Sequence, residues 1–211
     1  MYRIIKVLNI VLLLMLTSVS VTFAQNSVAV IWDAPSQWVE KEANVNALET
    51  KLKEVLPASE YSIQPLSTTN AKLSSYRASH NLLAKSQTEA APNLSKDAIL
   101  NLAAGSDYAM VIRMDSIISD AYLMGQVVVP TVVNYYVFDI ANVQVYNAKT
   151  GKLLYKNKQF MGKGDNSAIG AMFKSADSVS QERKDEIYQK AFEKCLENFT
   201  FDASHIHKLE N

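Results

Sequence analysis

The sequence has little cysteine, little histidine and no excess of either charge. Its single cysteine, Cys195, excludes a disulfide within the chain, so the fold must rely on its apolar core. Three histidines leave few candidates for a general base or a metal ligand. Lys plus Arg and Asp plus Glu each number 21, and this balance gives no electrostatic reason to expect nucleic acid or an anionic membrane as a partner.

Long apolar runs are also missing beyond the N-terminal segment. After residue 24 no stretch reaches the length of about 18 apolar residues that a membrane span needs, so we expect no integral span in the mature chain. The N-terminal segment itself has two basic residues, Arg3 and Lys6, before the apolar run 10–16 (IVLLLML). We therefore expect residues 1–24 to be a secretory signal peptide cleaved near Ala24-Gln25, which places the protein in the periplasm or outside the cell. An uncleaved N-terminal anchor is the alternative.

The remaining chain shows the periodicities of a single α/β (α+β) domain over residues 25–201, followed by a flexible tail, 202–211. Apolar and polar residues alternate from Tyr108 to Asp115, which predicts a strand, and Asn147–Gly151 has the composition of a hairpin turn. The order β-α-β-α-α-β-β-β-α predicts a mixed β-sheet with helices packed on it. The expected strands are 27–32, 61–66, 108–118, 132–146 and 152–161, and the expected helices are 39–56, 69–84, 96–104 and 181–199, with Ser95 and Ser178 or Ser180 as N-caps.

No catalytic constellation stands out. The G-x-S-x-G pattern of serine hydrolases is absent, although Ser167 in GDNSAIG comes within one glycine of it. His80 is the one histidine within an expected core element, on or beside the apolar face of the helix 69–84. We expect it to be a partly buried structural residue rather than a base.

Cofactor and metal motifs are missing as well. Gly162, Gly164 and Gly170 match neither a dinucleotide fingerprint nor a P-loop, and we expect the first two to close the last strand. The pair His205-x-His207 lies in a polar tail without further ligands nearby. We expect no catalytic residue, no bound cofactor and no functional metal.

Two segments are candidates for binding. Asp33 and Trp38 belong to the loop after the first strand, where α/β folds often place ligands, although a structural role for Asp33 and core packing of Trp38 are the simpler alternatives. The link 119–131 is unusually apolar for a connection between strands, which predicts either a buried hairpin or an exposed one that meets a partner. Its large apolar residues are Tyr122, Leu123, Met124, Val127, Val128 and Val129.

Three short stretches resemble a known family. They are SVAVIWDAP (27–35), ILNLAAGSDYAMVIRMDSI (99–117) and VQVYNAKTGKLLY (143–155). They are similar to the first strand, the "helix, G-A-D-Y, strand" unit and the D-A-x-T-G hairpin of exported α/β domains related to the curli assembly/transport component, the activators of penicillin-binding proteins and the N-terminal domain of the Tol-system propeller protein. Asn147 stands where that hairpin usually has Asp, and the lipid-accepting cysteine of the secretion-pore members is missing.

The resemblance implies a non-catalytic envelope protein that binds other proteins. Our first hypothesis is therefore an exported protein-interaction domain in cell-envelope assembly or maintenance, whose partners are other envelope proteins or a second copy of itself. The alternative is an extracytoplasmic ligand-binding module that uses the loop after the first strand. A hydrolase centred on His80 is the third reading.

Overall fold

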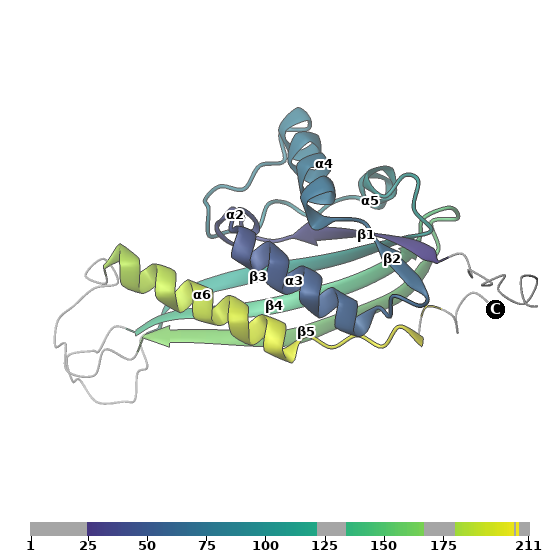
Figure 1. Ribbon diagram of the computed structural model, residues 1–211. Coiled ribbons are helices and arrows are strands. Elements are labelled where there is room, and N and C mark those ends of the chain that lie inside the picture. The colour runs from purple at the N-terminus through teal and green to yellow at the C-terminus, as the bar shows by residue number, and fades with distance from the viewer. Residues whose placement is uncertain (1–24, 122–133, 167–179, 205, 207–211) are drawn as a thin grey trace, which may run out of the picture.

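The computed structural model describes residues 25–121, 134–166, 180–204 and 206, and it confirms the expected α/β class. Five strands form one mixed sheet in the order β2-β1-β3-β4-β5 (Figure 1). The elements are β1 (Asn26–Asp33), α2 (Ser36–Val39), α3 (Glu42–Val55), β2 (Tyr61–Ile63), α4 (Leu66–Ser79), α5 (Lys96–Leu102), β3 (Tyr108–Ala121), β4 (Asn134–Asn147), β5 (Leu153–Asn166) and α6 (Gln181–Asn198).

The sheet combines two kinds of connection. β1 pairs in parallel with β2 and with β3, and helices make both crossovers between these parallel strands. β3, β4 and β5 then form an antiparallel meander, in which Tyr108 pairs with Asn147 and Ala121 with Asn134. Parallel neighbours need long crossovers, whereas antiparallel neighbours can be joined by a tight turn, and this explains why all the helices except α6 precede the meander.

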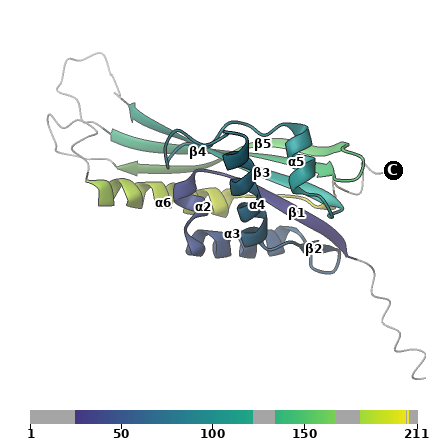
Figure 2. The same ribbon diagram turned by 90° about the horizontal axis from the view of Figure 1, so that it is seen from above.

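Strand alternation divides the sheet into two faces. On one face, Val30 of β1 and Met110 of β3 belong to a core cluster with residues of α3 and α6. On the other face, Ile31 of β1 and Val111 of β3 belong to a second, smaller cluster with residues of α4 and α5. Figures 1 and 2 show this arrangement, with α6 lying along β4 and β5 on the first face. The second face therefore has helices over β1 and β3 but not over β4 and β5.

Several local predictions are confirmed by hydrogen bonds. Ser95 caps α5 by accepting from the Ala98 amide at 3.2 Å, and Ser180 caps α6 by accepting from the Arg183 amide at 3.3 Å. In the turn after β4, the Asn147 side chain accepts from the amides of Lys149 and Thr150, and Gly151 adopts φ +68°. Cys195 is fully buried, as the helical pattern predicts.

The helix boundaries differ from the expected ones. The expected helix 39–56 begins later, as α3 at Glu42, because the chain is extended at Lys41, and the separate short helix α2 precedes it. The expected helix 69–84 begins earlier, at Leu66 directly after Pro65, and ends at Ser79 because Asn81 adopts a left-handed φ of 54°. The predicted partial burial of His80 is wrong as a consequence, because this residue lies exposed at the end of α4, where it stacks on Tyr76.

Two differences concern the C-terminal half. Gly162 and Gly164 do not close the last strand; they lie within β5 and pair with Asp139 and Val137 of β4. The chain after α6 was expected to be a flexible tail from residue 202, yet Ile206 is fully buried in the larger core cluster. An apolar side chain in an otherwise polar segment anchors this part of the chain.

Candidate binding cavity on the sheet

The strand register places two rows of side chains on the second face of the sheet. One row across the strands is Ile31, Val111, Gln144 and Lys156, and the neighbouring row is Asp33, Arg113 and Asn142. Directly paired residues point to the same face, so each row starts under the helices and ends on the uncovered strands. The first row changes from apolar to polar where the helix cover ends.

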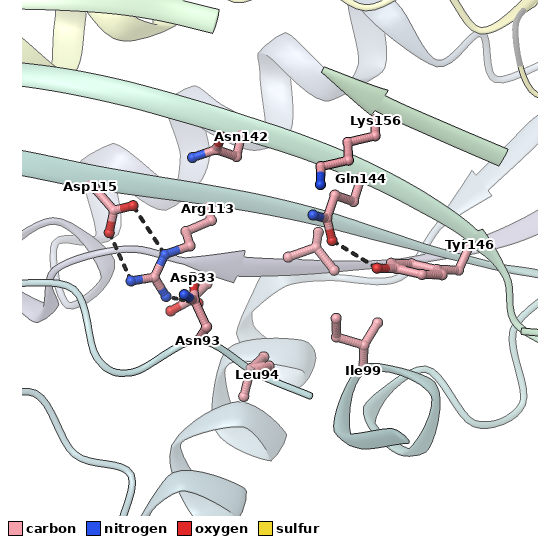
Figure 3. A pocket seen from close by; sticks show the side chains of 11 residues that line it. Asp33, Asn93, Leu94, Ile99, Arg113, Asp115, Asn142, Gln144, Tyr146 and Lys156 are labelled. Atoms are coloured by element: carbon pink, nitrogen blue, oxygen red, sulfur yellow. Dashed lines mark hydrogen bonds and ion pairs between the residues drawn. The ribbon is translucent and has the colours of Figure 1, made fainter. Parts of the chain in front are cut away.

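A cavity of about 440 Å³ lies where this change occurs (Figure 3). Strands β1, β3, β4 and β5 provide its floor, and α5 and the segment before it provide a wall. Its lining residues are Asp33, Asn93, Leu94, Ile99, Val111, Arg113, Asp115, Asn142, Gln144, Tyr146 and Lys156. The volume is within the range of about 300–1,000 Å³ that small-molecule sites occupy.

One end of the cavity is built on a buried ion cluster. Asp33 is 3% exposed, and its two carboxylate oxygens accept from different arginines, Arg77 at 2.7 Å and Arg113 at 2.8 Å. Burial raises the pKa of Asp33 above its usual value, while the two guanidinium groups oppose that rise. Both oxygens accept from guanidinium N–H groups, and this geometry fits an ionised carboxylate.

The same arginines hold the segment 80–94, which we call the strap, across the end of β1. Arg77 donates to the carbonyls of Leu82 and Pro92, and Arg113 donates to the carbonyl of Ala91. Arg113 also contacts Asp115 through two nitrogens, Nε at 3.1 Å and Nη2 at 2.8 Å. The cluster therefore fixes the wall of the cavity to its floor.

The other end of the cavity is neutral. The Tyr146 hydroxyl donates to the Gln144 Oε1 at 2.9 Å, which orients the amide and leaves its nitrogen as a donor. Partial burial raises the pKa of Tyr146, so this hydroxyl keeps its proton at neutral pH. Within the described part of the chain, the side chains of Asn93, Asn142 and Lys156 have no hydrogen-bond or ion-pair partner.

A second, smaller cavity of about 210 Å³ lies on the far side of the ion cluster, between α4 and the strap. Trp32, Leu73 and Leu83 contribute to its lining, and Asp33 and Arg77 separate it from the first cavity. Its lining is more apolar, and it offers fewer groups that could orient a ligand.

The two residues expected in a ligand loop separate in the structure. Asp33 lines both cavities, although its oxygens are already paired. Trp38 has no exposed surface; its ring packs against Tyr188 and Phe192, and its indole nitrogen donates to the Tyr188 carbonyl at 3.2 Å. Trp38 therefore supports the core beneath the loop and does not face either cavity.

The expected interaction hairpin lies outside the described residues. Its six apolar residues, Tyr122, Leu123, Met124, Val127, Val128 and Val129, fall in the segment 122–133, which joins the paired ends of β3 and β4. The hypothesis that this segment meets a partner stays a prediction.

Sequence reasoning missed most of the cavity. Arg77, Asn142, Gln144, Tyr146 and Lys156 were not singled out. A signal did exist in β4, where polar residues 142, 144 and 146 alternate with Val143 and Val145, which are fully buried. This alternation indicates a strand with one face that no helix covers.

No group of three or more His, Cys, Asp or Glu side chains is placed to hold a metal ion in the described ranges. None of the helices that the structure describes is both long enough and apolar enough to cross a membrane.

Comparisons with known proteins give only distant similarities. No protein-family model matches the chain, and no curated protein does. The chain is similar to the lipoprotein GNA1162 from Neisseria meningitidis (11% identity, TM-score 0.36, 74% of this chain and 88% of that one). It is also similar to the hypothetical protein CT253 from Chlamydia trachomatis (9% identity, TM-score 0.30, 82% of this chain and 95% of that one). A third similar structure is a neuraminyllactose-binding hemagglutinin homolog from Helicobacter pylori (13% identity, TM-score 0.40, 90% of this chain and 89% of that one).

These TM-scores are too low to support an assignment of family or function. None of the three proteins is described as a member of the curli-related families, so that resemblance also stays a prediction.

Proposed function

We propose that this protein is an exported, non-catalytic binding module of the cell envelope, and that its ligand occupies the cavity on the uncovered half of the sheet. The signal-peptide pattern of residues 1–24 supports export. The proposal follows the second of the two binding hypotheses from the sequence, with the site moved from the loop after β1 onto the adjoining strands.

The observation that carries the proposal is a set of polar side chains on the face of the sheet that have no partner among the residues that the structure describes. Asn142 and Lys156 extend from paired strands, and Asn93 extends from the strap, which the ion cluster holds in place. Asn93 and Lys156 are exposed and Asn142 is half-buried, so a ligand can reach all three side chains from solvent.

The chemistry of the lining favours binding over catalysis. None of the eleven lining residues is a serine, threonine, cysteine or histidine, so the cavity offers no alcohol or thiol nucleophile beside an imidazole base. Its two carboxylates are both engaged by Arg113. This arrangement serves to hold a shape rather than to transfer protons.

A photo-crosslinking experiment in the cells that express the protein tests this function. The full-length chain would carry p-benzoylphenylalanine in place of Asn142, in place of Lys156 or, as a control, in place of Lys190, which is exposed on α6 away from the cavity. We expect a discrete adduct at the first two positions and none at the third. Absence of an adduct from both cavity positions would refute the proposal.

A further inference from the structure

We infer that the ligand of this cavity is a neutral saccharide; the inference rests on the proposed function and adds the chemical class. Three features of the cavity support this class: its charged groups are largely paired, its free polar groups are neutral amides, and an apolar surface lies beside those amides.

The strong charges of the cavity are neutralised internally. The guanidinium of Arg113 contacts Asp33, Asp115 and the Ala91 carbonyl, and both oxygens of Asp33 are occupied. Among the described residues Lys156 has no ion-pair partner, and Asp115 contributes negative charge to the same cavity. A phosphate or other multiply charged anion normally requires several convergent cations or backbone amides, which this lining does not supply.

The backbone beneath the cavity is also used. Over residues 142–146, β4 pairs with β3 on one side and with β5 on the other, so its amides and carbonyls take part in sheet ladders. A peptide bound by strand addition needs an open sheet edge, and this surface is a sheet face. The available groups are therefore those of side chains.

These side-chain groups suit hydroxyls. The carboxamides of Asn93, Asn142 and Gln144 each present an acceptor, a donor or both, and a sugar hydroxyl can act as either partner. The bond from Tyr146 fixes the Gln144 amide, so its nitrogen points away from the tyrosine (Figure 3). Gln144 is thus an oriented neutral donor, and the two asparagine amides beside it are neutral as well, so the three can meet hydroxyls without attracting ions.

An apolar surface completes the site. Tyr146 and Ile99 lie toward one end of the cavity, whereas Arg113 and Asp115 lie toward the other (Figure 3). A pyranose ring has C–H groups on its faces and hydroxyls around its rim, so one face can pack on the half-buried Tyr146, which lies beside the buried Ile99, while the rim reaches the amides. The apolar and polar parts of the lining therefore correspond to the apolar faces and the polar rim of a pyranose.

Binding measurements with defined probes test the inference. Full-length protein would be titrated by calorimetry with chitotriose, maltotriose and cellotriose, and with tri-alanine and inorganic phosphate as comparators. We expect saturable binding of at least one saccharide. We expect Gln144→Ala to weaken that binding about tenfold, because it removes the amide donor that Tyr146 orients. Gln181→Ala, on the exposed start of α6, should leave it unchanged.

The possible failures are distinguishable. If none of the three saccharides binds, or if phosphate or tri-alanine binds and depends on Gln144, the saccharide assignment is overturned. If mass spectrometry of the proteolysed adduct at position 142 shows that the cross-linked mass is a peptide and not a periodate-sensitive glycan, the saccharide assignment is also overturned, while the proposed binding function would stand. Absence of both adduct and binding would remove both conclusions.

Discussion

Replacing Asp33 with Asn tests the ion cluster on which the cavity is built. The variant keeps the size of the side chain but removes its charge, and it turns one acceptor oxygen into a donor that faces a guanidinium. Arg77 is 8% exposed and would lose its carboxylate partner, while Arg113 would keep Asp115. Breaking a buried ion pair by removing one partner costs about 3–5 kcal/mol, so we expect Asp33→Asn to lower the free energy of unfolding by that amount.

Urea denaturation of the two proteins measures this difference. The matched control is Asp115→Asn, because Asp115 also pairs with Arg113 but is 37% exposed, and it should cost less than about 1 kcal/mol. Hydrogen exchange should also become faster in the strap, since its carbonyls accept from the two arginines. A loss below about 1 kcal/mol for Asp33→Asn, with strap protection unchanged, would refute the reasoning.

Three further predictions concern single positions. The pKa of Asp107 is lowered to about 2 by hydrogen bonds from Lys149 and Ser27, so its contribution to stability is present above pH 4 and is lost as the pH falls toward 2. Acid titration of the unfolding free energy should show this loss, of about 1 kcal/mol given solvent screening, and Asp107→Asn should remove it. Trp38→Ala should cost about 3–5 kcal/mol by denaturation because the ring is fully buried, and an effect within 1 kcal/mol of wild type would contradict its place in the core. Gly151→Ala should lower the melting temperature more than Gly105→Ala: both glycines have positive φ, but only at Gly151 would a new Cβ lie 3.0 Å from other side chains.

Local features of this fold could be predicted from the sequence. The strand from Tyr108, the caps at Ser95 and Ser180 and the turn after Asn147 each depend on residues within a few positions of one another. Periodicity and turn chemistry act over that range, so a single sequence contains the information.

The ion cluster depends on pairs that are distant in the chain. Arg77 follows Leu73 by one helical turn and shares its buried face, yet a basic residue in an amphipathic helix is normally assigned to solvent. Its partner Asp33 is 44 residues away, and only the packing of α4 on β1 brings the two together. Local patterns cannot specify such a contact.

Local sequence patterns do not specify the cavity either. The alternation of β4 predicts a polar face at Asn142 and Gln144, but it does not say that α5 ends before covering them. Helix cover depends on the length of α5 and on the strand order, which are properties of the whole sheet.

The Asp33 cluster also acts as a cross-link in a chain that has no intramolecular disulfide. It joins β1 to positions 44 and 80 residues further along the sequence, a span over which exported proteins commonly use a disulfide. A cross-link made of charges needs no oxidant and no isomerase, and reducing agents cannot open it. The cavity can therefore assemble on either side of a redox boundary, and its integrity depends on the ionisation of one carboxylate instead of on the thiol chemistry of its surroundings.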